Sequence, residues 1–445
     1  MTGRRLPEVR LAFFLATGLA VPFYAFPLVK ILGRGVDLAT ILALLFVLSS
    51  LVAGSHRRNS IASRIWIAVA AVVPALVLIP PGPPVFRPFG FLISYGHWLL
   101  VSVFFFFSLS LQTSERTRTR VALWNLLAGT AIALFAIYQV VGIPRRWLAT
   151  GPVLAPFQRE PLRLTWIEGS SHGSPYPRPT SVFLEPAWMG GYLSWVLVLG
   201  FGLAFLASQA VGPRIRFLAR AALALILFAI AASVSWGSYA DFVAAAGVGL
   251  VILFLGRRFP SRRKLLAVAG VAVLMLALAA VSPPGRRVAR AVSDRWTQLT
   301  RTPIVEGEPE PLYSDSSWVR ARNLVYTARL FRAHATRGIG LGQFANYAGP
   351  EGRSSPSFRK DPWCGWVAIA AEMGVLGPPV LFGALLLIFR RWWRRRSGGL
   401  EDVAVPALLA IAFVQQFHTA SFLDLWWWYP VSVASALCGP PAPRA

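Results

Sequence analysis

Long apolar runs separated by short polar segments extend over almost the whole chain. Each run is close to the length, about 17–25 residues, with which a helix crosses roughly 30 Å of hydrocarbon. Runs such as "FLISYGHWLLVSVFFFFSLSL" are continuous and lack the period-2 alternation of a membrane barrel strand. The pattern predicts an all-α polytopic membrane protein with about twelve transmembrane helices, over residues 11–29, 38–54, 65–80, 89–111, 121–142, 182–208, 217–236, 239–256, 265–281, 363–389, 403–420 and 425–439.

Basic residues between the predicted helices fall mainly on one side of the membrane. "HRRNSIASR", "ERTRTR" and "RRWWRRR" lie on the side of the N-terminus, whereas short loops of the other side carry few basic residues. Short cytoplasmic loops are enriched in Lys and Arg, so we predict that both termini are cytoplasmic. The chain then divides into residues 1–142 with helices 1–5, 143–181 as a first long outer loop, 182–281 with helices 6–9, 282–362 as a large outer loop with amphipathic helices, and 363–445 with helices 10–12 and a short cytoplasmic tail.

Composition and charge refine this class of protein. Hydrophobic residues make up 56% of the chain and charged residues 14%. A formal net charge of +26 could indicate nucleic-acid binding. Much of the excess lies in the inner loops, where it fixes orientation and meets anionic lipid, so we expect a lipid bilayer and no nucleic acid as partner. Cys364 and Cys438 are predicted on opposite faces and therefore unpaired.

No metal-binding signature is present in the sequence. There is no HExxH and no acidic pair like the DxD of nucleotide-sugar enzymes, so we expect neither a metal nor another cofactor. The five histidines show no spacing that indicates a shared site. His97 and His418, near the outer ends of predicted helices, are interpreted as hydrogen-bonded core residues.

The two long outer loops hold the charged residues that do not set the orientation. The larger loop contains twelve arginines and two amphipathic patterns, "PGRRVARAVSDRWTQL" and "SDSSWVRARNLVYTARLFRAH". The second predicts a helix with an apolar side formed by Trp318, Ala321, Val325, Ala328 and Phe331. Arginine presents a planar fork that matches phosphate oxygens. A cluster of arginines beside an apolar bundle indicates a ligand that is part lipid and part pyrophosphate; the alternative is anchoring to lipid phosphates.

A glycine-rich segment, "RGIGLGQF", follows the second amphipathic pattern. Its spacing fits neither the P-loop nor the dinucleotide fingerprint, so we interpret it as a tight turn back toward the bundle. Glu372 lies inside the next predicted membrane helix. A carboxylate at that depth is expected to be paired or functional.

These segments, in this order, resemble the superfamily of O-antigen ligases and Wzy-type polysaccharide polymerases of bacterial inner membranes. The resemblance covers most of the chain and is sharpest in "RPTSVFLEPAWMGGYL" and in "RARNLVYTARLFRAHATRGIGLGQF" followed by "WVAIAAEMGVLG". It implies a GT-C-like helical fold and glycosyl transfer, at the periplasmic face and without a metal, from an undecaprenyl-diphosphate-linked glycan to an acceptor hydroxyl. It also implies a flippase and a chain-length regulator as partners.

The resemblance assigns roles by position. Arg178 and Arg320 match family arginines that hold the diphosphate, and Glu185 occupies the family's Glu/Asn position. A set of neighbouring arginines is added from charge and helical position: Arg322, Arg329 and Arg337. Glu185 is open to two interpretations, a catalytic base or an ion pair with Arg178 at a helix N-terminus.

Two segments depart from the family pattern. Ligases carry a histidine before the helix that follows the glycine turn, whereas this chain reads "KDPWCGW" there, with Asp361 as the nearest polar residue. The second, "SVSWGSYADF", has no arginine where many members have Ser-Arg. The first departure favours a polymerase with Glu185 or Asp361 as base and Arg178 beside it. The alternatives are a ligase that transfers the glycan to lipid A core, and a transporter of polyprenyl lipid or polysaccharide.

Overall fold

Helices follow the apolar runs of the sequence and make up most of the described part of the chain. The computed structural model describes residues 6–24, 26–31, 34–79, 86–111, 114–142, 145, 179–183, 186–206, 211–255, 316–347, 364–395, 400–419 and 422–438. Seven helical segments in this part are long and apolar enough to cross a membrane. Length and composition therefore indicate a polytopic membrane protein.

The first part of the chain forms α1 to α5 and one hairpin. Its elements are α1 (Leu6–Ala20), η1 (Val21–Phe23), β1 (Pro27–Ile31), β2 (Arg34–Asp37), α2 (Leu38–Val52), η2 (Ser55–Arg58), α3 (Ile61–Ala75), η3 (Leu76–Leu78), α4 (Pro88–Ser108) and α5 (Glu115–Gly142). β1 and β2 pair antiparallel, with Ile31 opposite Arg34. α2 begins where the Asp37 carboxylate accepts a hydrogen bond from the Thr40 backbone N–H at 2.7 Å, which caps the helix.

The second part supplies the remaining helices of the bundle. Its elements are α6 (Pro186–Phe201) with a π-helical extension η6 (Gly202–Leu206), α7 (Pro213–Ala232), α8 (Trp236–Leu255), α11 (Ser316–Ala333), α12 (Phe344–Tyr347), α14 (Gly365–Met373), η7 (Gly374–Leu376), α15 (Gly377–Arg394), α16 (Leu400–His418) and α17 (Leu425–Leu437).

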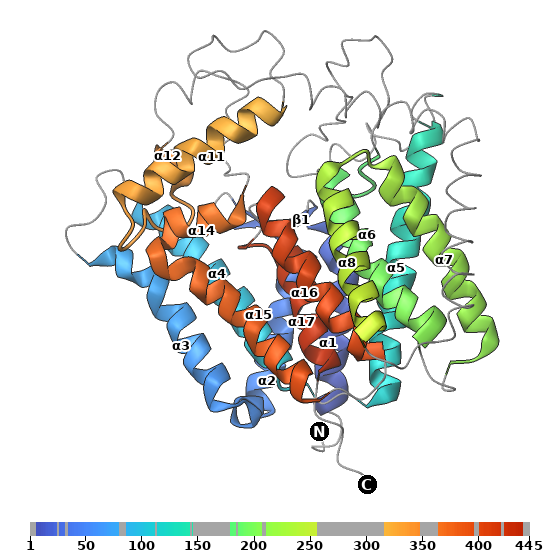
Figure 1. Cartoon of the computed structure of the whole chain (residues 1–445). Coiled ribbons are helices and arrows are strands. Elements are labelled where there is room, and N and C mark those ends of the chain that lie inside the picture. The colour runs from blue at the N-terminus through green and yellow to red at the C-terminus, as the bar shows by residue number, and fades with distance from the viewer. Residues whose placement is uncertain are drawn as a thin grey trace.

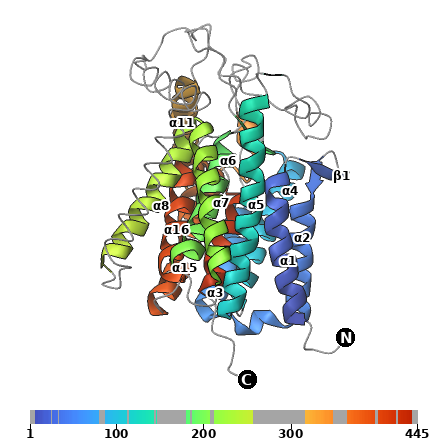
Figure 2. The same cartoon turned by 90° about the vertical axis from the view of Figure 1, so that its right-hand side faces the viewer.

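The long helices run between two ends of the bundle (Figure 1). We call the end that carries α11, α12 and α14 the upper end, and the end where α1 starts and α17 finishes the lower end. Figure 2 shows the long helices side by side, with α11 above them. α6, α8 and α17 start at the upper end and α16 finishes there, so their terminal residues meet at one level.

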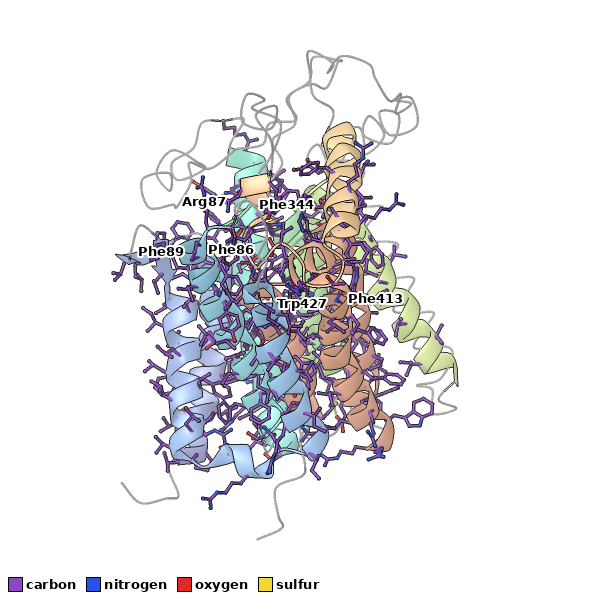
Figure 3. All side chains as sticks on the ribbon, turned by 90° about the vertical axis from the view of Figure 1, so that its left-hand side faces the viewer. Phe86, Arg87, Phe89, Phe344, Phe413 and Trp427 are labelled. Carbon is purple, nitrogen blue, oxygen red and sulfur yellow. The ribbon has the colours of Figure 1, made fainter. Side chains whose placement is uncertain are left out.

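α17 forms the centre of the bundle. Every residue from Leu425 to Leu437 is buried, which is the pattern of a helix surrounded by other helices. The peripheral helices differ, because large apolar side chains such as Leu48 of α2 and Val72 of α3 are exposed. Figure 3 shows these outward side chains along the helices. An apolar outer surface of this kind suits contact with lipid tails.

Basic side chains at the lower end bind the carbonyls that end helices. Arg391 donates to the Leu109 carbonyl after α4, and Arg395 donates to the Cys438 carbonyl after α17 at 3.0 Å. Arg118 of α5 pairs with Glu401 of α16. Cys364 precedes α14 at the upper end and Cys438 follows α17 at the lower end. Both thiols are free, as the sequence predicted.

Helices occur at every predicted span within the described residues, with two corrections. The span predicted over 11–29 ends earlier, because α1 gives way to η1 and to strand β1 at Pro27. The helix predicted over 363–389 is broken at Gly374, whose φ of 70° cannot continue an α-helix. The predicted span 265–281 lies outside the described residues, as does the first amphipathic segment of the large loop.

α11 confirms the second amphipathic segment as a helix. Its buried side carries Asn323, Thr327 and Leu330, because α11 packs on the short helix α14. Of the predicted apolar side, Phe331 packs against a buried cluster, whereas Val325 is 48% exposed. The side chains of Trp318 and Ala321 lie outside the described residues. The apolar side of α11 is therefore only partly turned toward the bundle.

The glycine turn after α11 pairs with the end of α14 and confirms the tight return to the bundle. The backbone N–H groups of Ile339 and Gly340 donate to the carbonyls of Ala371 and Glu372, each at 2.9 Å. Gly338 has a φ of 74°, and a Cβ there would overlap the carbonyl oxygen of Glu372. Glycine at this position permits both the turn and the close approach.

We predict that Gly338→Ala destabilises the protein. The left-handed conformation and the overlap with backbone together should cost more than about 2 kcal/mol. The matched control is Gly96→Ala in α4, because a Cβ at Gly96 meets nothing within 4 Å. Thermal unfolding in detergent should show a lower Tm for the first variant only. Equal Tm values for both variants would contradict the account of this turn.

Candidate active site

An aspartate and a histidine from two helices meet near the upper end of the bundle. Asp241 lies in the second turn of α8 and His418 is the last residue of α16. His418 Nε2 is 2.9 Å from Asp241 Oδ1. The Asp241 side chain is 0% exposed and that of His418 is 14% exposed. The pair therefore joins a buried carboxylate to an imidazole that reaches the edge of the packed bundle.

The second carboxylate oxygen of Asp241 faces the side-chain amide of Gln415, beside Gly191 of α6. Neither Oδ2 nor the Gln415 amide makes a well-formed hydrogen bond to the described part of the chain. An unsatisfied buried polar group costs about 1–3 kcal/mol. Gln415 is the group next to this oxygen, and buried polar groups with poor hydrogen-bond geometry call for an explanation.

The other imidazole nitrogen of His418, Nδ1, points toward Gly237. A Cβ at Gly237 would lie 2.5 Å from Nδ1, so only a glycine leaves the imidazole in its position. Nδ1 is buried and has no hydrogen-bond partner within the described residues. Since Nε2 is held by the carboxylate, Nδ1 of the neutral ring carries the free lone pair.

The loop between α7 and α8, just before Gly237, has an unusual backbone. Val234 has a φ of 45°, a conformation that β-branched residues rarely adopt. After this loop, Ser238 packs against the start of α6, with its Oγ 3.5 Å from the Ala187 carbonyl oxygen. Strained positions of this kind cluster at binding and catalytic sites. The segment "SVSWGSYADF" thus contributes to the site through Val234, Gly237 and Ser238.

A second strained residue lies just before α6. Ser181 has a φ of 52°, and the buried Gln139 of α5 holds it in place. Gln139 Oε1 accepts from the N–H groups of Thr180 and Ser181 at 3.1 and 2.7 Å, and Nε2 donates to the Ser181 carbonyl at 3.1 Å. In the sequence, Arg178 lies two positions before Thr180 and Glu185 lies four positions after Ser181.

Aromatic rings lie at the same level on the side of α6 away from α8. Trp188 of α6 stacks on Trp426 of α17, with ring centroids 5.7 Å apart. Tyr24 packs on Trp188 with centroids 5.2 Å apart. Trp188 is partly exposed. The upper end therefore combines polar groups with a partly open aromatic surface.

The structure describes few of the site residues predicted from the sequence. Three of them lie outside the described residues: Arg178, Glu185 and Asp361. The backbones of Arg320 and Arg322 belong to α11, but their side chains also lie outside the description. Their roles stay predictions.

Arg329 and Arg337 are the two predicted arginines whose side chains are described. Arg329 is exposed on α11, where it is accessible to a ligand. Arg337 donates from Nη1 to the Ile79 carbonyl at 2.7 Å, at the end of η3. Arg337 therefore connects the glycine turn to α3 and η3 in this structure, and diphosphate binding by it stays a prediction.

Glu372 is a paired carboxylate, one of the two possibilities that its sequence position left open. It is buried in the last turn of α14, and its Oε2 accepts a hydrogen bond from the Gly342 N–H at 3.0 Å. Next to it, Gln343 binds the backbone of Arg87 in both directions, at 2.9 and 3.2 Å. Figure 3 shows Phe86, Arg87 and Phe344 in this region. The carboxylate stabilises the glycine turn.

Sequence reasoning missed the pairing of Asp241 with His418. The two residues are 177 positions apart. His418 was interpreted as a hydrogen-bonded core residue, but the sequence did not identify Asp241 as the group that it binds. One signal was available. Both residues lie near the outer ends of predicted helices, so the topology already placed them at a similar depth.

We predict that Glu372→Gln is tolerated and Glu372→Ala is not. The amide oxygen of glutamine can still accept from Gly342, whereas alanine leaves that N–H unsatisfied, at a cost of about 1–3 kcal/mol. Thermal unfolding of both variants checks this expectation. A glutamine variant that loses as much stability as the alanine variant would show that the charge itself is required.

Comparison with known proteins adds no assignment. No family model matches the chain, and no curated protein matches it. A function must therefore be argued from the geometry of the upper end and from the motifs quoted above.

Proposed function

We propose that the protein is a glycosyltransferase that polymerises undecaprenyl-diphosphate-linked oligosaccharide repeat units. It would act at the periplasmic face of the bacterial inner membrane, with the upper end of the bundle facing the periplasm. The observation that carries this proposal is the gathering at that one end of strained backbone at Ser181 and Val234, the pair of Asp241 and His418, and the partly exposed Trp188.

The distribution of buried charge supports chemistry at a surface. Four charged side chains are buried among the described residues, namely Arg10, Asp241, Glu372 and Glu401. Arg10 and Glu401 lie at the lower end, where Arg10 donates to Ser50 and Ser110 at 3.0 Å and Glu401 pairs with Arg118. Asp241 and Glu372 lie near the upper end. No described charge lies midway, where a transport path would require polar groups.

The proposed reaction needs a clamp and a proton acceptor. The acceptor hydroxyl oxygen bonds to the anomeric carbon, the bond from that carbon to the phosphate oxygen breaks, and its electron pair leaves with the diphosphate. Arginines stabilise this developing charge. The predicted set is Arg178 and Arg320, with Arg322, Arg329 and Arg337. Direct displacement inverts the anomeric centre and requires no metal.

Two features near the start of α6 fit these roles. Gln139 fixes the backbone of Ser181, which lies between Arg178 and Glu185 in the sequence, and transfer chemistry depends on positioning of this kind. Trp188, partly exposed beside this segment, offers a ring face on which a sugar can stack. The polymerase assignment over a ligase rests on "KDPWCGW", which lacks the histidine typical of ligases.

A transporter is the second candidate, because a buried carboxylate and imidazole can also relay protons. The pair joins α8 to α16, and movement of these helices would couple proton transfer to substrate passage. Such a protein would move lipid-linked material across the membrane without changing its length.

We predict that Arg178→Ala abolishes chain elongation in cells. Loss of one diphosphate contact in a water-poor site removes transition-state stabilisation of about 10²–10³-fold. The native gene is deleted and complemented with wild type, with Arg178→Ala, or with the control Arg57→Ala, which removes the same charge from an exposed site at the lower end. Lipid-carrier-linked and lipid-A-linked glycans are then separated by size.

Single repeat units in the deletion strain, extended by wild type and by Arg57→Ala but not by Arg178→Ala, are the expected result. Long chains stranded on the lipid carrier after deletion would indicate a ligase. Unchanged glycans in both fractions would contradict glycosyl transfer.

A further inference from the structure

We propose that His418 accepts the proton of the acceptor hydroxyl and that Asp241 positions it. This role rests on the proposed glycosyl transfer. It would replace the carboxylates Glu185 and Asp361 as the base, and it uses residues that the sequence motifs do not contain.

The pair has the geometry that this role requires. Asp241 Oδ1 accepts the Nε2 hydrogen bond at 2.9 Å, which fixes the ring orientation and the tautomer, leaving Nδ1 as the basic atom. A buried carboxylate also stabilises the imidazolium that forms when Nδ1 takes up a proton. Because Asp241 is completely buried, its carboxyl group is held in a fixed position against Nε2.

The surroundings of Nδ1 indicate a place for a substrate hydroxyl. The atom has no protein partner within the described residues, although a histidine that only joined two helices would be expected to have both nitrogens satisfied. Gly237 keeps the position beside Nδ1 free of a side chain. The imidazole is the partly exposed member of the pair, and because Nδ1 itself is buried beside Gly237, a sugar hydroxyl reaches this atom only after a local rearrangement at the ring.

The neighbouring groups suit a proton acceptor. Gln415 lies beside the second oxygen of Asp241, and its side-chain amide interacts with this oxygen and helps to hold the carboxyl group in place. The strained residue Val234 precedes Gly237 by three positions and sets the path of the loop next to the ring. Backbone strain and a buried carboxyl group therefore lie close to His418 Nδ1, which has no hydrogen-bond partner within the described residues.

The proton and electrons balance in this scheme. The acceptor O–H bond breaks as the oxygen attacks the anomeric carbon, and the proton moves to Nδ1. The electron pair of the broken glycosyl–phosphate bond leaves with the undecaprenyl diphosphate. The imidazolium later returns its proton to solvent or to the departing diphosphate, and the neutral ring is restored.

The test uses the full chain in lipid nanodiscs with a purified undecaprenyl-diphosphate-linked repeat unit. His418→Gln should lower kcat by about 10²–10⁴-fold, the usual contribution of a general base, while KM stays near the wild-type value. Asp241→Asn should also lower kcat. Stabilisation by undecaprenyl diphosphate, measured as the rise in Tm, should match wild type in both because donor binding is retained.

Two glycines of α8 provide a matched pair. A Cβ at Gly237 would displace the imidazole, so Gly237→Ala should reduce kcat strongly, whereas Gly247→Ala should not, since a Cβ there meets nothing within 4 Å. Added imidazole should restore part of the rate of His418→Ala. A purely structural histidine would show no such rescue, so this measurement decides the role even where a substitution lowers stability.

The outcomes distinguish a failure of the proposed glycosyl transfer from a failure of the proposed role of His418. Wild type that fails to elongate the repeat unit overturns the glycosyl transfer and this role with it. Wild type that elongates, together with a folded His418→Gln variant whose kcat stays within about threefold of it, overturns the role of His418 alone. Loss of donor stabilisation without a change in kcat would also contradict it.

Discussion

Polar atoms inside a lipid-embedded bundle cannot form hydrogen bonds with water, and this constraint governs where they occur in the protein. Each must pair within the chain or lie near an end of the bundle. Arg10 donates hydrogen bonds to the hydroxyls of Ser50 and Ser110, and the basic residues of the lower end bind helix-terminal carbonyls. At the upper end the Asp241 carboxylate pairs with His418. The non-glycine residues with positive φ among those described, Ser181 and Val234, also lie at this end, and the functional account rests on this combination.

The upper end is nevertheless built rigidly. The glycine turn and α14 hold each other through backbone hydrogen bonds and through Glu372. Gln139 fixes the segment before α6. The fully buried α17 and the ring contact between Trp188 and Trp426 join this end to the centre of the bundle. Rigid supports of this kind place reacting groups accurately, which is most of what a transferase must supply when its donor already carries a good leaving group.

The sequence predicted the helices well because apolar runs of membrane-spanning length have few alternatives. It predicted the details of their ends less well. β1 is apolar and follows α1 closely, so its strand geometry is not visible in a hydropathy pattern. The break at Gly374 depends on the sign of φ, which composition does not reveal.

The site was predictable in outline only. The motif around Glu372 was located, and its pairing with Gly342 was one of two stated possibilities. The apolar side of α11 was located, but the burial of the polar Asn323 and Thr327 against α14 was not predicted. The pairing of Asp241 with His418 depends on how α8 and α16 pack across 177 residues of chain. No local spacing encodes such a contact.

The most direct test of the central claim is the stoichiometry of the purified protein's reaction. The wild-type chain is reconstituted with a lipid-linked repeat unit as the sole substrate, in the presence of a metal chelator and without nucleotide sugar. Our account predicts longer glycans and the release of one undecaprenyl diphosphate for each new glycosidic bond. Repeat units that stay single, or that cross the bilayer unchanged without release of the carrier, would contradict it.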